Sequence, residues 1–228
     1  MLISEIYQSR QGEGLWAGTE SIFIRSSGCN LRCWFCDTPF TSWAPEGDNQ
    51  SIEQVLAAVG THSASHVVIT GGEPMLWTEL TLLTTRLHQQ GKTLTIETAG
   101  TVMRDVYCDL MSISPKLSNS TPDPTTAGKW SARHEATRWR PDVIRRLIAR
   151  HPFQLKFVVD VPDDIHEIKA AVATLSPLDT SRVLLMPQGT DPDELLVKEN
   201  WLQPLAAQHG FTYCPRQHIL WYGHTRGT

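Results

Sequence analysis

The sequence lacks any hydrophobic segment long enough to cross a bilayer. Its longest apolar runs, at 66–70 and 155–159, are only as long as a strand, whereas a membrane-spanning helix needs about 20 apolar residues in succession. The first residues carry neither the basic start nor the apolar stretch of a secretory signal peptide. We therefore expect a cytoplasmic protein with no membrane partner.

An excess of positive charge is also missing. The chain has 20 Lys and Arg against 24 Asp and Glu, a formal net charge of −4, so the composition does not indicate nucleic-acid binding. Hydrophobic residues make up 40% and charged residues 19%, which excludes a disordered chain. Because the 228 residues contain no repeat or low-complexity segment, we expect a single domain, 1–228, with an irregular insertion around 118–140.

Cysteine is scarce and unevenly placed. There are five cysteines; three fall within eight residues, whereas Cys108 and Cys214 stand alone. A disulfide framework would normally spread an even number of cysteines along the chain. The spacing therefore indicates metal ligation in a reducing compartment, and we expect the two isolated cysteines to be small core residues.

Strand-like and helix-like segments alternate along the chain. We expect strands at 21–26, 66–70, 93–98, 110–114, 153–159 and 182–186, with a short one at 211–214, and helices at 51–59, 80–90, 141–150, 163–175 and 192–208. This alternation predicts an α/β fold with helices packed on a parallel sheet. Six units are fewer than the eight of a closed barrel, so we expect a partial (βα)6-like barrel or a curved open parallel sheet.

Polar groups gather where the predicted strands end. They are the cysteine loop, the segment 71–74, Glu97, the segment 114–116 and Gln188. The carboxyl ends of parallel strands share one edge of the sheet, and active sites form at that edge. The sequence therefore predicts one site built from these groups.

The cysteines Cys29, Cys33 and Cys36 have the spacing C-x3-C-x2-C. Three thiolates on one short loop can ligate three irons of a 4Fe–4S cluster and leave the fourth iron open to a small molecule. A structural zinc site is normally closed by four ligands. Asp37 or His62 could complete such a set, so a non-enzymatic zinc module remains an alternative.

The cysteine spacing, together with Gly71-Gly72-Glu73-Pro74, resembles the radical S-adenosylmethionine (SAM) superfamily. The resemblance implies that the cluster transfers an electron to SAM and so generates a 5′-deoxyadenosyl radical, with the three cysteines as the catalytic ligands. It implies cofactor-binding roles for Phe35, Gly72, Glu73, Ser114, Lys116 and Gln188. Without the resemblance, Phe35 could equally be a core aromatic residue.

Further segments narrow the resemblance. They are Gln11–Gly14, Phe23–Arg25, Cys36–Thr38, Glu97–Gly100 and Ser114–Lys116, and together they resemble the 7-carboxy-7-deazaguanine synthase family of the queuosine and deazapurine pathway. The resemblance implies hydrogen abstraction at C6 of 6-carboxy-5,6,7,8-tetrahydropterin, ring contraction with loss of ammonia, and regeneration of SAM. It also implies Mg²⁺, a homodimer and an electron donor such as flavodoxin. A glycyl-radical-enzyme activator is the enzymatic alternative.

The family resemblance implies a substrate-binding set and a Mg²⁺ ligand, Thr38. The substrate-binding set comprises Gln11, Gly12, Glu13, Gly14, Arg25, Thr70, Gly71, Glu97 and His218. The two-pronged guanidinium of Arg25 matches a carboxylate. Glu97 lies in an apolar strand, which is unfavourable unless the carboxylate is paired or bound to a ligand.

Two positions are ambiguous. Lys156 interrupts an apolar strand and could be either a buried partner of a carboxylate or an edge-strand lysine. Near the C-terminus, Arg216 occupies the place of the glutamine in the family's Gln-x-His pattern. If this segment is a strand, a shift of one residue would reverse the side that Gln217 faces. We therefore carry over His218 and not Gln217.

Overall fold

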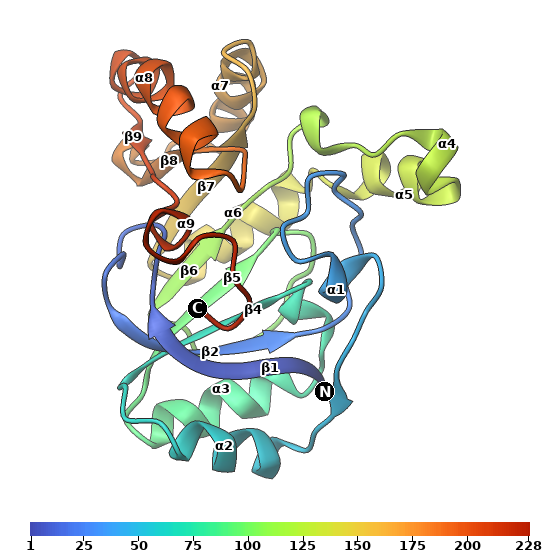
Figure 1. Cartoon of the computed structure of the whole chain (residues 1–228), viewed down its shortest axis with the longest axis vertical. Coiled ribbons are helices and arrows are strands. Elements are labelled where there is room, and N and C mark those ends of the chain that lie inside the picture. The colour runs from blue at the N-terminus through green and yellow to red at the C-terminus, as the bar shows by residue number, and fades with distance from the viewer.

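A nine-stranded sheet forms the centre of the computed structural model, which describes residues 1–228 (Figure 1). The strand order is β3-β1-β2-β4-β5-β6-β7-β8-β9. The strands are β1 (Leu2–Arg10), β2 (Glu20–Ser26), β3 (Asp48–Asn49), β4 (His66–Gly71), β5 (Thr93–Thr98), β6 (Leu110–Ile113), β7 (Phe153–Val159), β8 (Val183–Pro187) and β9 (Thr212–Tyr213). Neighbours from β2 to β9 pair in parallel, whereas β1 and β3 add antiparallel pairs at one edge. The sheet is open, as predicted.

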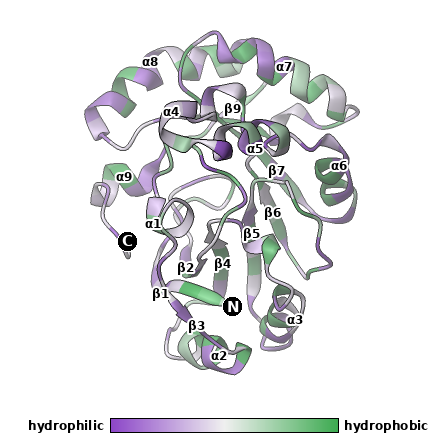
Figure 2. Ribbon diagram, turned by 90° about the vertical axis from the view of Figure 1, so that its right-hand side faces the viewer, coloured by the Kyte–Doolittle hydropathy of each residue, from purple (hydrophilic) through white to green (hydrophobic).

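Helices cover the outer face of this curved sheet (Figure 2). They are α2 (Ile52–Gly60), α3 (Leu80–Gln89), α6 (Pro141–Arg150), α7 (Asp164–Leu175) and α8 (Pro192–Gln208). The predicted capping box is present: Ser51 Oγ accepts from Gln54 N, and Gln54 Oε1 accepts from Ser51 N. Buried apolar side chains of these helices pack against the sheet in one cluster.

Alternation along the strands separates an apolar face from a polar one. In β2, Ile22 and Ile24 belong to the core under the helices, whereas Arg25 points to the other side. In β7, Leu155 and Phe157 lie in the core, and Lys156 faces the opposite way. Burying each large apolar side chain stabilises the fold by about 1.5–3 kcal/mol. The inner, concave face is thus left for polar groups.

Several elements were not predicted or were predicted differently. Strand β1 is half-exposed along its length, so its apolar alternation is weak in the sequence. The short helix α1 (Pro39–Ser42) follows the cysteine loop, and α9 (Gln217–Tyr222) follows β9, where no helix was expected. The insertion contains α4 (Pro124–Ala127) and α5 (Lys129–Thr137) rather than irregular structure throughout. The buried residues of α5 are Ser131 and His134, so this helix has no apolar periodicity to detect.

No helix is long and apolar enough to span a membrane.

Candidate active site

A cavity of about 450 Å³ opens on the concave face at the carboxyl ends of the parallel strands. This volume is within the range of about 300–1,000 Å³ that is usual for small-molecule sites. The structure brings the following sequence-predicted residues to its wall: Gln11, Gly12, Glu13, Arg25, Cys29, Cys33, Phe35, Cys36, Thr38, Thr70, Gly71, Gly72, Glu97, Ser114, Lys116, Gln188 and His218. Gly14 and Glu73 were expected in the site but do not line the cavity.

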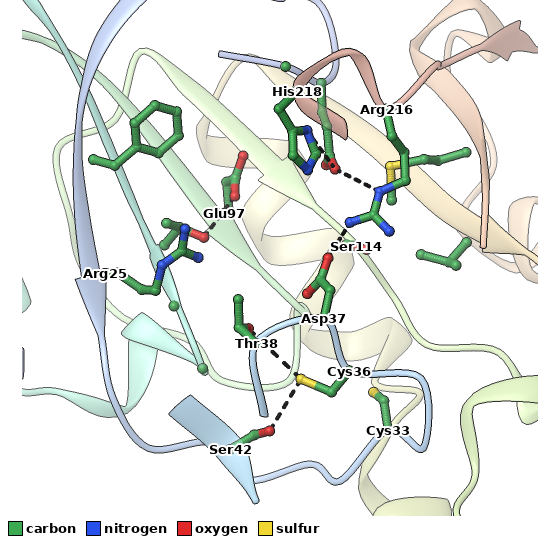
Figure 3. Close-up of a pocket in the computed structure, with 18 of the residues that line it drawn as sticks. Arg25, Cys33, Cys36, Asp37, Thr38, Ser42, Glu97, Ser114, Arg216 and His218 are labelled. Carbon is green, nitrogen blue, oxygen red and sulfur yellow. Dashed lines mark hydrogen bonds and ion pairs between the residues drawn. The ribbon is translucent and has the colours of Figure 1, made fainter. Parts of the chain in front are cut away.

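The three cysteines of the loop after β2, Cys29, Cys33 and Cys36, all line this cavity. Figure 3 shows two of them, Cys33 and Cys36. Burial raises the pKa of the Cys29 and Cys33 thiols to about 12, so their thiolate forms need a cationic partner such as iron. Cys36 Sγ lies 3.2 Å from Ser42 Oγ. Three sulfur donors at one cavity fit an iron–sulfur cluster.

A fourth ligand that would close a zinc site is not supplied. Asp37 pairs instead with Arg216, and His62 does not line the cavity. No group of three or more His, Cys, Asp or Glu side chains has the geometry to hold a single metal ion. The donor set therefore fits the cluster better than the zinc alternative.

Glu73 lies beneath the glycine loop rather than in the cavity. Its fully buried carboxylate accepts hydrogen bonds from Thr98 Oγ1 (2.8 Å), Ala99 N (2.8 Å) and Met75 N (3.0 Å). Desolvation raises the pKa of Glu73 although these hydrogen bonds oppose the rise. The carboxylate thus ties the glycine loop to the end of β5, and Gly71 and Gly72, not this side chain, line the cavity.

The two glycines of this loop allow a close backbone contact with the cysteine loop. A Cβ on Gly72 would lie 2.2 Å from the carbonyl oxygen of Gly28. Gly71 has φ of +124°, and a Cβ there would lie 1.9 Å from the carbonyl oxygen of Ser26. Glycine is required at both positions because no side chain fits between the two loops.

Arg25 is held in place by two residues of β1. Its Nε donates to Glu5 Oε1 at 2.6 Å, and one Nη donates to the Tyr7 hydroxyl at 2.6 Å. Tyr7 stacks on Phe23, with ring centroids 5.1 Å apart. Glu5 also accepts from Arg226 Nε at 3.0 Å. The remaining guanidinium donors are available to the cavity.

Glu97 forms a second polar group on the same wall (Figure 3). Its carboxylate accepts from Gln11 Nε2 at 3.1 Å and from Thr70 Oγ1 at 2.8 Å. These contacts bring together three residues that the sequence assigned to the substrate. Neighbouring amide, hydroxyl and carboxylate groups can form hydrogen bonds with the polar edge of a heterocycle.

A network of charges occupies the opposite side of the cavity. Lys156 Nζ donates to Glu13 Oε2, which identifies Lys156 as the buried partner of a carboxylate. Arg216 Nε lies 3.4 Å from Glu13 Oε1, and its guanidinium also pairs with Asp37. Burial alone would raise the pKa of Glu13, but Lys156, His218 and Arg216 lower it below its ordinary value. Desolvation lowers the pKa of His218, so the imidazole is neutral at neutral pH.

The residues expected to hold SAM contact one another or the core. Lys116 Nζ donates to Ser114 O (2.7 Å) and Oγ (2.8 Å). Gln188 Oε1 accepts from Lys198 Nζ at 3.2 Å. Phe35 packs against a small inner cluster that includes Met186 and also lines the cavity, so its cofactor-binding role stays a prediction.

Several cavity residues escaped the sequence analysis. Glu5 and Tyr7 lie on the unpredicted strand β1, and Arg216 was noted only as the residue in the place of the family's glutamine. The C-terminal segment also reaches the cavity through His224, Thr225, Arg226 and Thr228. The only available signal was the density of charged and aromatic residues near the C-terminus.

Comparison with known proteins agrees with this geometry. Residues 23–117 match the radical SAM superfamily. A 7-carboxy-7-deazaguanine synthase of Rhodopirellula baltica is 47% identical over 100% of this chain and 89% of its own length. A protein of the same name from Halobacterium salinarum is 45% identical over 96% of this chain and 90% of its own.

Solved structures agree as well. The crystal structure of QueE from Escherichia coli superposes with a TM-score of 0.72 at 25% identity, covering 95% of this chain and 94% of that chain. The structure of TYW1 with a lysine–pyruvate adduct bound shares the fold, with a TM-score of 0.56 at 16% identity over 81% of this chain and 73% of that one. The chain therefore belongs to the 7-carboxy-7-deazaguanine synthase family and is a radical SAM enzyme.

Proposed function

We propose that the protein converts 6-carboxy-5,6,7,8-tetrahydropterin into 7-carboxy-7-deazaguanine with loss of ammonia, as a lyase that uses SAM as a cofactor. One observation carries this proposal beyond family membership. The three cysteines, Arg25 and Glu97 line a single cavity. The cysteines would hold the source of the radical, Arg25 would bind a carboxylate, and Glu97 would form hydrogen bonds with a heterocycle.

Cys29, Cys33 and Cys36 would ligate three irons of a 4Fe–4S cluster, with the fourth iron open to SAM. When bound, the cluster and SAM supply a 5′-deoxyadenosyl radical that abstracts the hydrogen at C6. Gly72, Phe35, Ser114, Lys116 and Gln188 line the cavity and would contact SAM. The protein would bind SAM and the substrate, orient the substrate hydrogen toward the radical, and exclude water from the site.

The substrate would lie between the β1 side of the cavity and the charged network. Arg25, already held by Glu5 and Tyr7, directs its remaining donors to the substrate carboxylate. Gln11, Thr70 and Glu97 would contact the pterin edge. Lys156 keeps the carboxylate of Glu13 ionised, so that this group acts as an acceptor.

The remaining parts of the proposal rest on the family resemblance. Thr38 would offer a hydroxyl oxygen to Mg²⁺, a hard ion that prefers oxygen ligands. We expect a homodimer in the cytoplasm and a flavodoxin as the electron donor. Gly12, Gly14, Gly71 and His218 complete the proposed substrate set, although Gly14 lies behind the cavity wall.

Anaerobic purification and turnover test the proposal. We expect a brown protein with about four irons per chain, which forms the deazaguanine product when incubated with SAM, Mg²⁺, a reductant and the carboxytetrahydropterin. Turnover without any protein substrate separates this function from glycyl-radical activation. A colourless, zinc-loaded protein would contradict the cluster, and a brown protein inert toward the pterin would contradict the substrate.

A further inference from the structure

The Arg216 side chain contacts three loops that are distant in sequence. It immediately precedes α9, is only 6% exposed, and lies beside the cavity (Figure 3). One Nη pairs with the Asp37 carboxylate, and the other donates to Gly189 O at 2.5 Å. Its Nε lies 3.4 Å from Glu13 Oε1. All these contacts are to loop residues.

Each of these loops carries a different part of the proposed reaction. Asp37 directly follows Cys36 of the cysteine loop. Gly189 follows Gln188 in the loop after β8, which faces the SAM side of the cavity. Glu13 belongs to the loop after β1 that is assigned to the substrate. One guanidinium therefore connects the cluster, cofactor and substrate loops.

The chemistry of arginine suits this connection. Its planar fork presents five donors in a fixed geometry and is always charged. Glu13 and Asp37 are carboxylates on separate loops, and without a cation between them their like charges would repel. A lysine at this position would keep the charge, but it lacks the planar group that donates to Asp37 and Gly189 at once while it lies beside Glu13. Lys156, the other cation of the network, pairs with Glu13 but not with Asp37.

We propose that Arg216 is a positioning residue that fixes the cysteine, SAM and substrate loops relative to one another, so that the substrate hydrogen lies within reach of the radical. This inference rests on the proposed function. Abstraction requires close approach of two reacting groups, and a displacement of about 1 Å lowers a rate by about 100-fold. Without Arg216, SAM would therefore still be cleaved, but fewer cleavage events would lead to product.

The uncoupled reaction has a definite product. In a coupled cycle the hydrogen taken from C6 is returned and SAM is regenerated, so 5′-deoxyadenosine does not accumulate. In an uncoupled event, one electron from dithionite, delivered through the cluster, cleaves SAM to methionine and the radical. The radical then takes a hydrogen atom from dithiothreitol instead of the substrate. The ratio of 5′-deoxyadenosine to deazaguanine product therefore measures positioning.

Three variants test the proposal in the reconstituted enzyme. Arg216→Gln removes the charge and the fork, whereas Arg216→Lys keeps the charge. Arg145→Gln is the control, because Arg145 also donates to a backbone carbonyl, that of Thr174, but lies on the outer helical layer away from the cavity. We expect Arg216→Gln to raise the 5′-deoxyadenosine-to-product ratio at least about tenfold, Arg216→Lys to give an intermediate ratio, and Arg145→Gln to match the parent.

Hydrogen exchange in the cofactor-free chain gives a readout that is independent of activity. A hydrogen bond to a charged group contributes a factor of about ten or more to local stability. We expect amides in 36–43 and 187–190 to exchange about tenfold faster in Arg216→Gln, and at the parent rate in Arg145→Gln. Unchanged exchange in both loops, or an unchanged product ratio, would overturn the proposal.

Two further outcomes are decisive. If Arg216→Gln does not fold, the test rests on Arg216→Lys. A ratio of 5′-deoxyadenosine to product equal to that of the parent in this variant would refute the role of the planar guanidinium. A parent enzyme that forms no deazaguanine would refute the proposed function. The exchange comparison would still support or refute the connection between the loops.

Discussion

Replacement of Lys156 by methionine tests the charged network most directly. Lys156 Nζ bonds to Glu13 Oε2, and their side chains are only 6% and 12% exposed. Methionine keeps most of the buried volume but leaves Glu13 without its main counter-ion. Removing one partner of a buried ion pair destabilises a protein by about 3–5 kcal/mol. Because Arg216 Nε still lies 3.4 Å from Glu13 Oε1, we expect the free energy of unfolding to fall by about 3 kcal/mol, the lower end of this range.

The pH dependence follows from the pKa of Glu13. Burial opposes ionisation, but Lys156, His218 and Arg216 lower the pKa of Glu13 overall. A carboxylate with a depressed folded pKa stabilises the native state above its ordinary pKa, and this stability is lost as the pH falls. Without Lys156 the pKa of Glu13 rises, and the protonated acid needs no counter-ion. The difference between parent and variant should therefore be larger at about pH 8 than at about pH 5.

Urea unfolding of the cofactor-free proteins at both pH values measures these differences. A loss of about 3 kcal/mol corresponds to a fall in Tm of about 6–12 °C for a chain of this size, which thermal unfolding would confirm. The double variant Glu13→Gln/Lys156→Met should recover part of the loss, because no unpaired carboxylate remains. The reasoning would be refuted if the loss of unfolding free energy in Lys156→Met were the same at both pH values. It would also be refuted if the double variant lost as much stability as the two single variants together.

Three further predictions concern the cluster and the ligands. Cys29→Ala should abolish formation of 5′-deoxyadenosine; a reconstituted variant that still makes it would show the ligand assignment to be wrong. Arg25→Ala removes a charged donor and should weaken substrate binding by about 10- to 100-fold with a smaller effect on SAM binding; equal losses in equilibrium binding would argue against its role. Gly72→Ala would place a Cβ 2.2 Å from Gly28 O, so we expect iron content per chain to fall on reconstitution, and full iron content would contradict this close contact.

The parallel strands and their ends could be predicted because their signals are local. Strand β7 spans Phe153–Val159 as predicted, because apolar residues recur at every second position between Pro152 and Asp160. Once the strands were placed, sheet topology alone brought most of the site residues to one edge. Strand β1 escaped prediction because it is half-exposed and its alternation is diluted by polar residues.

Contacts between distant segments could not be predicted. Arg216 and Asp37 are 179 positions apart, and nothing local to either residue indicates the other. The resemblance assigns Glu73 to the cofactor, and sequence position alone could not show that its carboxylate accepts hydrogen bonds from Thr98 and Ala99. Helix α5 was missed because His134 and Ser131, not apolar residues, make its buried contacts.

The contacts of Arg25 also affect the entropy of ligand capture. Glu5 and Tyr7 hold two of its donors in place, so its rotamers are already restricted in the folded chain. Immobilising a long side chain at an interface costs about 0.5–1.5 kcal/mol of binding free energy. For Arg25 that ordering takes place when β1 pairs with β2. If Arg25 binds the substrate carboxylate as proposed, that carboxylate would meet a guanidinium whose position is already fixed and would share it with Glu5.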